Sequence, residues 1–74
     1  MDCFIYYRNE QGVLPRILAA VTQRGIIVDS MSAGPAHYTL GFVAVLDIDI
    51  TSKQGQQLGR AWRGIVGVTD VKMA

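Results

Sequence analysis

Two segments of this chain carry apolar residues on a single helical face, and strand-like segments stand on both sides of each. The first segment has Leu14, Ile17, Leu18 and Val21, at the i, i+3, i+4, i+7 spacing of a helix with one buried side. The second repeats this stripe with Leu58, Ala61, Trp62 and Ile65. Two one-sided helices need a shared apolar surface, so the pattern favours helices packed on a sheet.

Both helices have recognisable ends. Pro15 falls in the first turn of the first helix, where its missing N–H costs nothing, and Gly25 supplies a stop. Thr51 and Gln54 match a capping box at the start of the second helix. Gly55 and Gly59 inside that helix have two readings: they permit close approach to the sheet, or they mark a weak helix.

Four segments have the composition or alternation of strands. They cover residues 3–7, 26–31, 38–50 and 68–73, and Gly34 and Pro35 are expected to break the second from the third. The third alternates with period two and places these residues on one face: Tyr38, Leu40, Phe42, Ala44, Leu46, Ile48 and Ile50.

The order of elements is therefore β-α-β-β-α-β. It predicts an α+β, ferredoxin-like sandwich, in which a four-stranded antiparallel sheet carries both helices on one face, as a single domain over residues 1–74. The second strand is the expected edge, and an unpaired edge invites a second copy. A chain of 74 residues with one cysteine also has few other routes to stability. We therefore predict a homodimer through Ile26, Ile27, Val28, Asp29, Ser30 and Met31.

Composition argues against several function classes. The net charge of +1 is scattered, so nucleic acid and membrane are not expected partners, and a nucleic-acid-binding module is a remote alternative. The absence of a targeting segment and the single Cys3 suggest a cytoplasmic protein. Cys3 and Trp62 are expected in the core, and His37 in a surface loop.

The polar residues do not assemble a catalytic or metal site. Asp47 and Asp49 are expected on a solvated strand face, and Arg60 and Arg63 on an exposed helix face where they are candidates for docking contacts. No nucleophile and base can be paired, and no His and Cys cluster exists for a metal. We expect no catalytic residue, no metal and no cofactor in this chain, which is not predicted to be an enzyme.

The segment Asn9-Glu10-Gln11-Gly12-Val13-Leu14-Pro15-Arg16-Ile17 resembles the signature of the ACT domain, the amino-acid-sensing module of biosynthetic enzymes. The segment Arg24-Gly25-Ile26-Ile27-Val28-Asp29-Ser30-Met31 resembles the second landmark of that family. Together they are most similar to the small regulatory subunit of acetolactate synthase, in its short, isozyme II form. The resemblance implies a homodimer that binds and activates a large catalytic subunit carrying thiamine diphosphate, magnesium and FAD.

The resemblance also implies a ligand site for a small amino acid such as valine, between two copies of the domain. Its residues would be Asn9, Gln11, Gly12, Val13, Leu14, Ile27 and Val28. A helix N-terminus favours a carboxylate, and Gly12 permits close approach of a ligand. The alternative reading is that Asn9 caps or turns the chain and that Gly12 only serves the turn.

One position departs from the family. Valine-inhibited relatives carry an asparagine on the second strand, and Ile27 stands there. Because a lost hydrogen bond to a buried polar ligand costs about 1–3 kcal/mol, we expect weak or no valine feedback. A free-standing amino-acid sensor that regulates another metabolic enzyme is the second reading of the chain.

Overall fold

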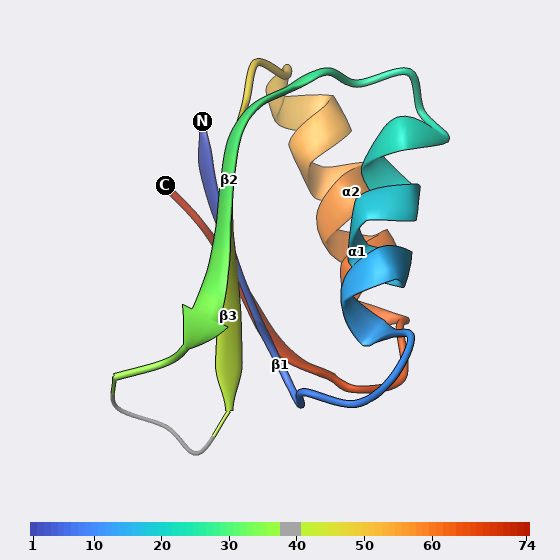
Figure 1. Cartoon of the computed structure of the whole chain (residues 1–74). Helices are drawn as coiled ribbons and strands as arrows, with labels where there is room; N and C mark the ends of the chain where they lie inside the picture. Colours follow the sequence, from blue (N-terminus) through green and yellow to red (C-terminus); the bar gives the residue numbers. More distant parts are fainter. Residues whose placement is uncertain (38–40) are drawn as a thin grey trace.

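The chain folds into one sheet with two helices packed on the same face (Figure 1). This computed structural model describes residues 1–37 and 41–74. The elements in chain order are β1 (Asp2–Tyr7), α1 (Val13–Thr22), β2 (Val28–Pro35), β3 (Phe42–Ile48), α2 (Ser52–Arg63) and β4 (Val68–Met73). The expected βαββαβ order and the placement of both helices are confirmed.

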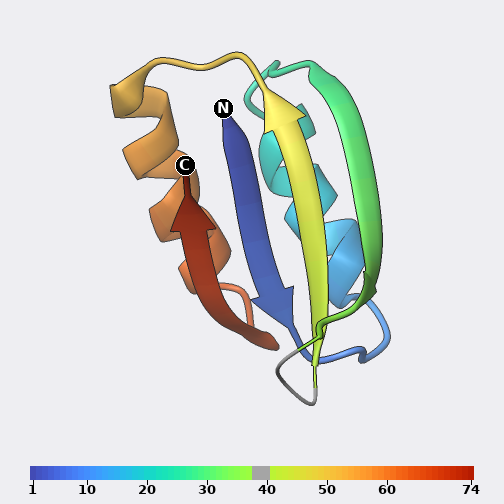
Figure 2. The same ribbon diagram turned by 90° about the vertical axis from the view of Figure 1, so that its left-hand side faces the viewer.

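The sheet is antiparallel throughout, with strand order β2-β3-β1-β4 (Figure 2). Residues that are directly paired on neighbouring strands point to the same side of the sheet. The side chains that face the helices therefore form rows that run across the strands. One such row joins Ala33, Ala44, Ile5 and Val71. Cys3, Ile5, Leu46 and Ile48 are fully buried on this face, so the two central strands supply the floor of the core.

The helices contribute the other half of the core. Ile17 and Val21 of α1 and Leu58 and Trp62 of α2 have no exposed surface. The buried stripe of α1 is shifted from the expected one, because Val13 and Ala20 are buried beside Ile17 and Val21 while the expected members Leu14 and Leu18 are only half-buried. Leu14 and Leu18 therefore lie on a flank of the helix.

The two glycines of α2 permit close packing. Gly55 and Gly59 are both buried. A Cβ atom on Gly59 would lie 3.3 Å from the terminal methyl of Met73 on β4 and 3.2 Å from a guanidinium nitrogen of Arg63. The close-approach reading is thus the correct one for Gly59. The expected capping box also forms, with Gln54 N–H donating to Thr51 Oγ1 (3.2 Å) and Thr51 N–H donating to Gln54 Oε1 (2.9 Å).

The second strand begins and ends later than residues 26–31. Gly25 N–H donates to the Thr22 carbonyl and Ile26 N–H to the Val21 carbonyl (3.0 and 3.3 Å), the two bonds of a Schellman helix stop. Ile26 thus completes the stop that follows α1, and β2 starts at Val28. The expected break at Gly34 and Pro35 is wrong, because both pair with β3. Proline is tolerated there because β2 is an edge strand.

The third strand is shorter than expected. β3 covers Phe42–Ile48, and the expected strand residues Tyr38 and Leu40 lie outside the described part of the chain. At its far end, Asp49 and Ile50 leave the sheet because Thr51 already caps α2. In the described part of the chain, no helix is long and apolar enough to cross a membrane.

Candidate functional site

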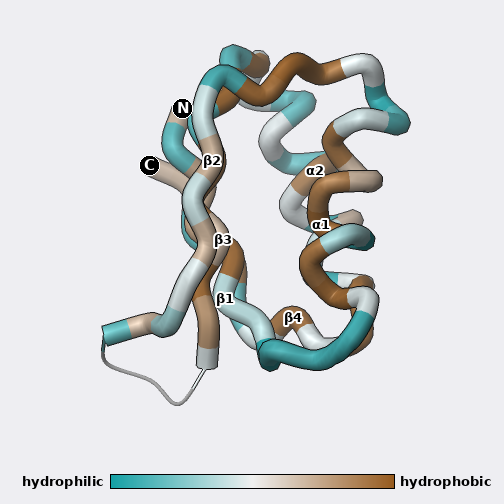
Figure 3. Tube along the Cα trace, in the orientation of Figure 1, coloured by the Kyte–Doolittle hydropathy of each residue, from teal (hydrophilic) through white to brown (hydrophobic). Residues whose placement is uncertain are grey.

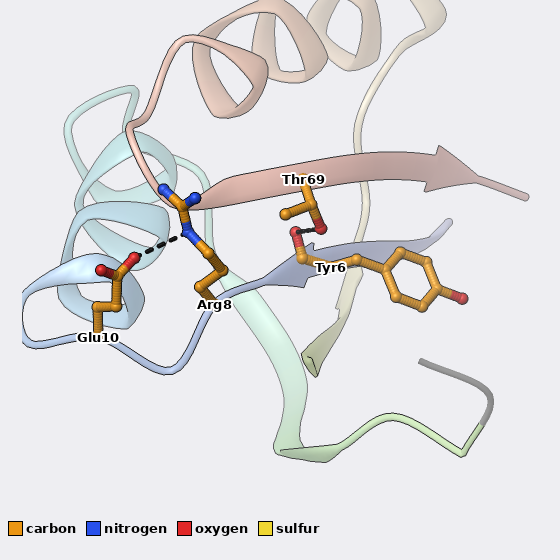
Figure 4. A network of polar contacts seen from close by, with 4 residues as sticks. All are labelled: Tyr6, Arg8, Glu10 and Thr69. Carbon is orange, nitrogen blue, oxygen red and sulfur yellow. Dashed lines mark hydrogen bonds and ion pairs between the residues drawn. The ribbon is translucent and has the colours of Figure 1, made fainter. Parts of the chain in front are cut away.

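The turn between β1 and α1 is held to the rest of the fold at one end. Arg8 N–H donates to the Gly67 carbonyl (2.8 Å), and Glu10 N–H donates to the Arg8 carbonyl (2.7 Å). The Arg8 side chain reaches along the turn, and its Nε lies 2.9 Å from Glu10 Oε1 (Figure 4). Figure 3 shows this segment as a polar stretch between β1 and the apolar first turn of α1. The turn has a defined shape and an exposed polar surface.

Gly12 stands at the N-cap of α1 in the left-handed region, with φ 87°. No side chain caps the helix, so the capping reading of Asn9 is wrong. Gly12 therefore serves the turn, because a residue with a Cβ would be strained at this φ, and a role in ligand binding stays a prediction. Asn9 is exposed, and its amide makes no hydrogen bond within the described residues.

The first turn of α1 offers a single unpaired backbone donor. Val13 N–H donates to the Glu10 carbonyl and Arg16 N–H to the Gly12 carbonyl, both at 3.3 Å. Pro15 has no N–H. Only the Leu14 N–H of this turn lacks an acceptor in the described part of the chain. A carboxylate at this helix end would meet that donor and the positive end of the helix dipole.

The other residues of the expected ligand site have different surroundings. Val13 is buried, and its Cγ2 would stand 2.7 Å from a Cβ placed on Gly67. Leu14 and Val28 are half-buried, Gln11 is exposed, and Ile27 is 79% exposed. The side chain of Val13 is therefore a core contact, whereas Ile27 is free for contact with another molecule.

One chain does not bring all of these residues together. Asn9, Gln11 and Gly12 precede α1, whereas Ile27 and Val28 follow it. The ten residues of α1 separate the two groups by about 15 Å at 1.5 Å per residue. Figure 1 shows the β1–α1 turn at one end of the molecule and the α1–β2 link at the other.

The edge of β2 carries an uncovered apolar strip. Met31 and Ala33 pair with the buried Leu46 and Ala44 and so face the helix side, yet both are exposed, Met31 by 46%. The side of α1 that faces α2 is the one that lines the groove between the helices, with Arg16, Ala19, Ala20 and Gln23. Leu14 and Leu18 lie on the opposite flank of α1. We call Leu14, Leu18, Ile27, Met31 and Ala33 the edge strip.

The sheet face without helices holds a broad hollow of about 1040 Å³. Phe4, Tyr6, Val43 and Val45 form its apolar centre, and Lys72 Nζ stands 5.7 Å from the centre of the Tyr6 ring. Thr69 Oγ1 donates to the Tyr6 carbonyl (3.1 Å; Figure 4). These residues were not predicted from the sequence, although the alternation of residues 3–7 indicates that Phe4 and Tyr6 point away from the core.

Among the titratable side chains of the described residues, Cys3 and Asp47 lie near the N-terminal ammonium. Cys3 is fully buried as expected, and burial raises the pKa of its thiol, an effect that the N-terminal ammonium opposes and that Asp2 and Asp47 reinforce. Asp47 is half-exposed and lies 3.6 Å from the N-terminal nitrogen. Within residues 1–37 and 41–74, no three His, Cys, Asp or Glu side chains gather as a metal site requires.

Searches by sequence find neither a matching family model nor a matching curated protein. Solved structures match over 96% of this chain. The small subunit of acetolactate synthase from Thermotoga maritima superposes with TM-score 0.83 at 18% identity, and the match covers 44% of that chain. The present chain thus spans less than half the length of that subunit.

The ACT domain of GTP pyrophosphokinase from Chlorobium tepidum matches in two determinations. Its solution structure gives TM-score 0.78 at 15% identity over 80% of that chain. Its crystal structure gives 0.75 at 13% over 91%. Sequence identities this low show that the fold is shared and nothing further. The arrangement of two helices on a β2-β3-β1-β4 sheet is that of these domains, and the chain has the ACT-domain fold.

Proposed function

We propose that this chain is a non-catalytic regulatory subunit that binds and activates the large catalytic subunit of acetolactate synthase in the cytoplasm. The shared fold with an acetolactate synthase small subunit supports this role, as does the resemblance of residues 9–17 to the ACT signature. The catalytic partner would carry the thiamine diphosphate, magnesium and FAD. The small subunit would act by binding the active conformation of its partner more tightly than the inactive one.

The observation that carries the proposal is the position of the turn at residues 9–12 relative to the edge strand. Pro35 pairs with Phe42, and Phe42 with Tyr7, the last residue of β1 before the turn. The Pro35 end of β2 therefore lies at the same end of the sheet as the turn. In a two-fold symmetric, antiparallel pairing of two β2 strands, the partner's Val28 comes beside this end. Asn9 and Gly12 of one copy would then meet the Ile27 and Val28 segment of the other.

The edge strip supports the homodimer that this geometry requires. Pairing of two β2 strands would satisfy the open backbone groups of both edges. The same pairing would also bury Met31 and Ala33 of β2, which lie beside the flank of α1 that carries Leu14 and Leu18. Burial of apolar surface is worth about 25 cal/mol per Å², so the strip is a favourable contact for a chain that is marginal by itself.

The test is an assay of the purified catalytic subunit with and without an equimolar amount of this chain. We expect a several-fold higher rate of acetolactate formation and little inhibition by valine. Equal rates with and without the chain would show that the activating role is wrong. A Val66→Lys variant serves as a control for surface substitution and should activate as the wild-type chain does, since Val66 is 76% exposed and lies outside the edge strip.

A free-standing amino-acid sensor that regulates another enzyme is the second candidate, because the same fold also occurs outside acetolactate synthase, in the ACT domain of GTP pyrophosphokinase. Such a sensor would bind an amino acid at the turn and regulate a different metabolic enzyme. Calorimetric titration with an amino acid, in the absence of any effect on the synthase, would favour this candidate over the first.

A further inference from the structure

The fold sorts the charges of this chain into two layers. The helix layer carries Arg16, Arg24, Lys53, Arg60 and Arg63, which are five of the seven basic residues. All six acidic residues lie in strands or in links that leave the sheet: Asp2, Glu10, Asp29, Asp47, Asp49 and Asp70. Neither α1 nor α2 contains an acidic residue. A net charge of +1 thus conceals a strongly cationic helix layer.

The five cations of this layer are exposed, and none takes part in an ion pair within the described residues. Arg24 Nη1 donates to the Ala20 carbonyl (2.8 Å) and Arg63 Nη2 to the Val71 carbonyl (3.1 Å). Arg16, Lys53 and Arg60 make no such bond in that part of the chain. Lys53 and Arg60 are seven residues apart and so share one side of α2. Uncompensated charge of one sign steers partners of the opposite sign.

The surface between these cations has room for side chains of another protein. A groove of about 320 Å³ runs between the helices, and it is lined by the polar Arg16, Gln23 and Arg24 and the apolar Ala19, Ala20, Ala61 and Ile65. Small apolar residues between guanidinium groups suit a peptide surface that presents carboxylates, which arginine binds with two parallel hydrogen bonds. Figure 1 shows both helices together on one side of the sheet.

Nucleic acid fits this surface less well. Binding of single strands relies on exposed aromatic side chains for base stacking. The helices contain one aromatic residue, Trp62, and it is fully buried. Lys53 and Arg60 are also separated by uncharged Gln56 and Gln57 rather than by further basic residues.

We infer that the helix layer, through Arg16, Lys53 and Arg60, is the surface that docks onto an acidic patch of the catalytic subunit. This inference rests on the proposed function for the identity of the partner, and it assigns the contact to the helices rather than to the uncovered sheet face. Pairing of two β2 strands leaves the helices of both copies on one side of the joint sheet, so a dimer would present twice this charge.

The test measures binding of the purified catalytic subunit to the wild-type chain and to two charge-matched double variants. Lys53→Gln with Arg60→Gln removes two helix-layer cations, whereas Arg8→Gln with Lys72→Gln removes two cations of the sheet layer. We expect the helix variant to bind about tenfold more weakly at low salt, with a shallower dependence on salt. The sheet variant should bind within about twofold of wild type.

Each other outcome has a distinct meaning. If the helix variant binds as tightly as wild type, or if the sheet variant loses as much affinity as the helix variant, this inference is overturned. The proposed function remains intact in both cases. No binding of the wild-type chain removes the proposed function and this inference together. If the wild-type chain is retained on polyuridylate RNA and the helix variant is not, this inference is overturned and the surface is assigned to nucleic acid instead. Arg16→Gln replaces the double variant if circular dichroism shows that the latter is unfolded.

Discussion

The indole Nε1 of Trp62 on α2 donates a 3.0 Å hydrogen bond to the carbonyl of Ile17 on α1, and both side chains are fully buried. The bond joins two helices through residues that are 45 positions apart in the chain. Trp62 also belongs to the same buried cluster as the helix-facing residues of β1 and β3, so it is part of the core that the helices and the sheet share.

Replacement of Trp62 by phenylalanine should destabilise the domain. The Ile17 carbonyl would lose its indole donor in the core, at a cost of about 1–3 kcal/mol in the free energy of unfolding, in addition to a small cavity. A Tyr6→Phe variant on the uncovered sheet face is the aromatic control and should be close to neutral. Urea denaturation followed by circular dichroism measures both, and equal midpoints for the two variants would contradict the assigned role of Trp62.

Gly67 should be intolerant of any side chain. Its φ is 103°, and a Cβ atom would come within 2.7 Å of Cγ2 of Val13, whose β-branched side chain cannot easily turn away. We expect Gly67→Ala to cost at least about 1 kcal/mol in the free energy of unfolding.

Gly34 provides the control for this substitution. It has no positive φ, and within the described residues no atom beyond its chain neighbours lies within 4 Å of the position that a Cβ would occupy, so Gly34→Ala should stay within about 0.5 kcal/mol of wild type. A double-mutant cycle with Val13→Ala isolates the steric part, and strict additivity of the two changes would mean that Val13 and Gly67 are not in conflict.

The homodimer can be tested at the edge strip. Met31→Lys places a charge on the strand expected to pair with a second copy, and an inward charge on an edge opposes strand pairing. We expect the variant to sediment as a monomer at concentrations where wild type is a dimer. Val66→Lys adds the same charge at another exposed apolar site and should leave the dimer intact. A wild-type chain that sediments only as a monomer would contradict the dimer itself.

Valine binding depends on Ile27 in our interpretation. Ile27→Asn restores a hydrogen-bonding side chain at the position where valine-inhibited relatives carry asparagine, and it should tighten valine binding about tenfold. Because Ile27 is exposed and outside β2, stability should change little. Calorimetric titration gives the affinities, with Val66→Asn as the control because Val66 is exposed and lies outside the edge strip; micromolar valine binding by wild type would contradict the expected weak feedback.

Alkaline pH should destabilise the fold through two buried groups. Burial raises the pKa of both the Cys3 thiol and the Tyr7 phenol, so the folded state holds these protons more firmly than the unfolded state. Their contribution to stability is fully present below the ordinary pKa of each group and is lost as the pH rises through the raised values. Cys3→Ala should flatten the decline in unfolding free energy above neutral pH.

The same burial predicts an inert thiol. A disulfide reagent such as Ellman's should label Cys3 no faster than the chain unfolds, because the thiol has no exposed surface. Immediate labelling of the native protein at neutral pH would show that β1 opens far more readily than its central position implies.

Local signals in the sequence were sufficient for most of the fold. Thr51 and Gln54 marked the start of α2, and the stripe through Leu58 and Trp62 marked its buried face. The limits of β2 were missed because two effects compete there. Ile26 is apolar and strand-like, yet its N–H completes the stop of α1. A proline normally ends a strand, but on an edge strand such as β2 its missing N–H can face the open side, where no ladder bond is lost.

The candidate site was harder to predict than the fold. Periodicity shows that Gly12 lies in a turn but cannot show that Val13 is held against Gly67, a contact between segments far apart in the chain. The division of charge was also hidden, because basic and acidic residues are scattered along the sequence and nearly balance in number. It emerges only when residues are grouped by layer, which requires the helices and strands to be known first.

This division of charge gives the molecule a dipole moment that points across the sheet, although its net charge is close to zero. In the electric field of a charged partner, such a molecule becomes oriented during its approach. Its helices point toward negative charge and its strands toward positive charge. Orientation during approach raises the share of collisions that lead to a complex without any increase in overall attraction. A protein of this kind can find one face of its partner quickly and still leave other charged surfaces alone.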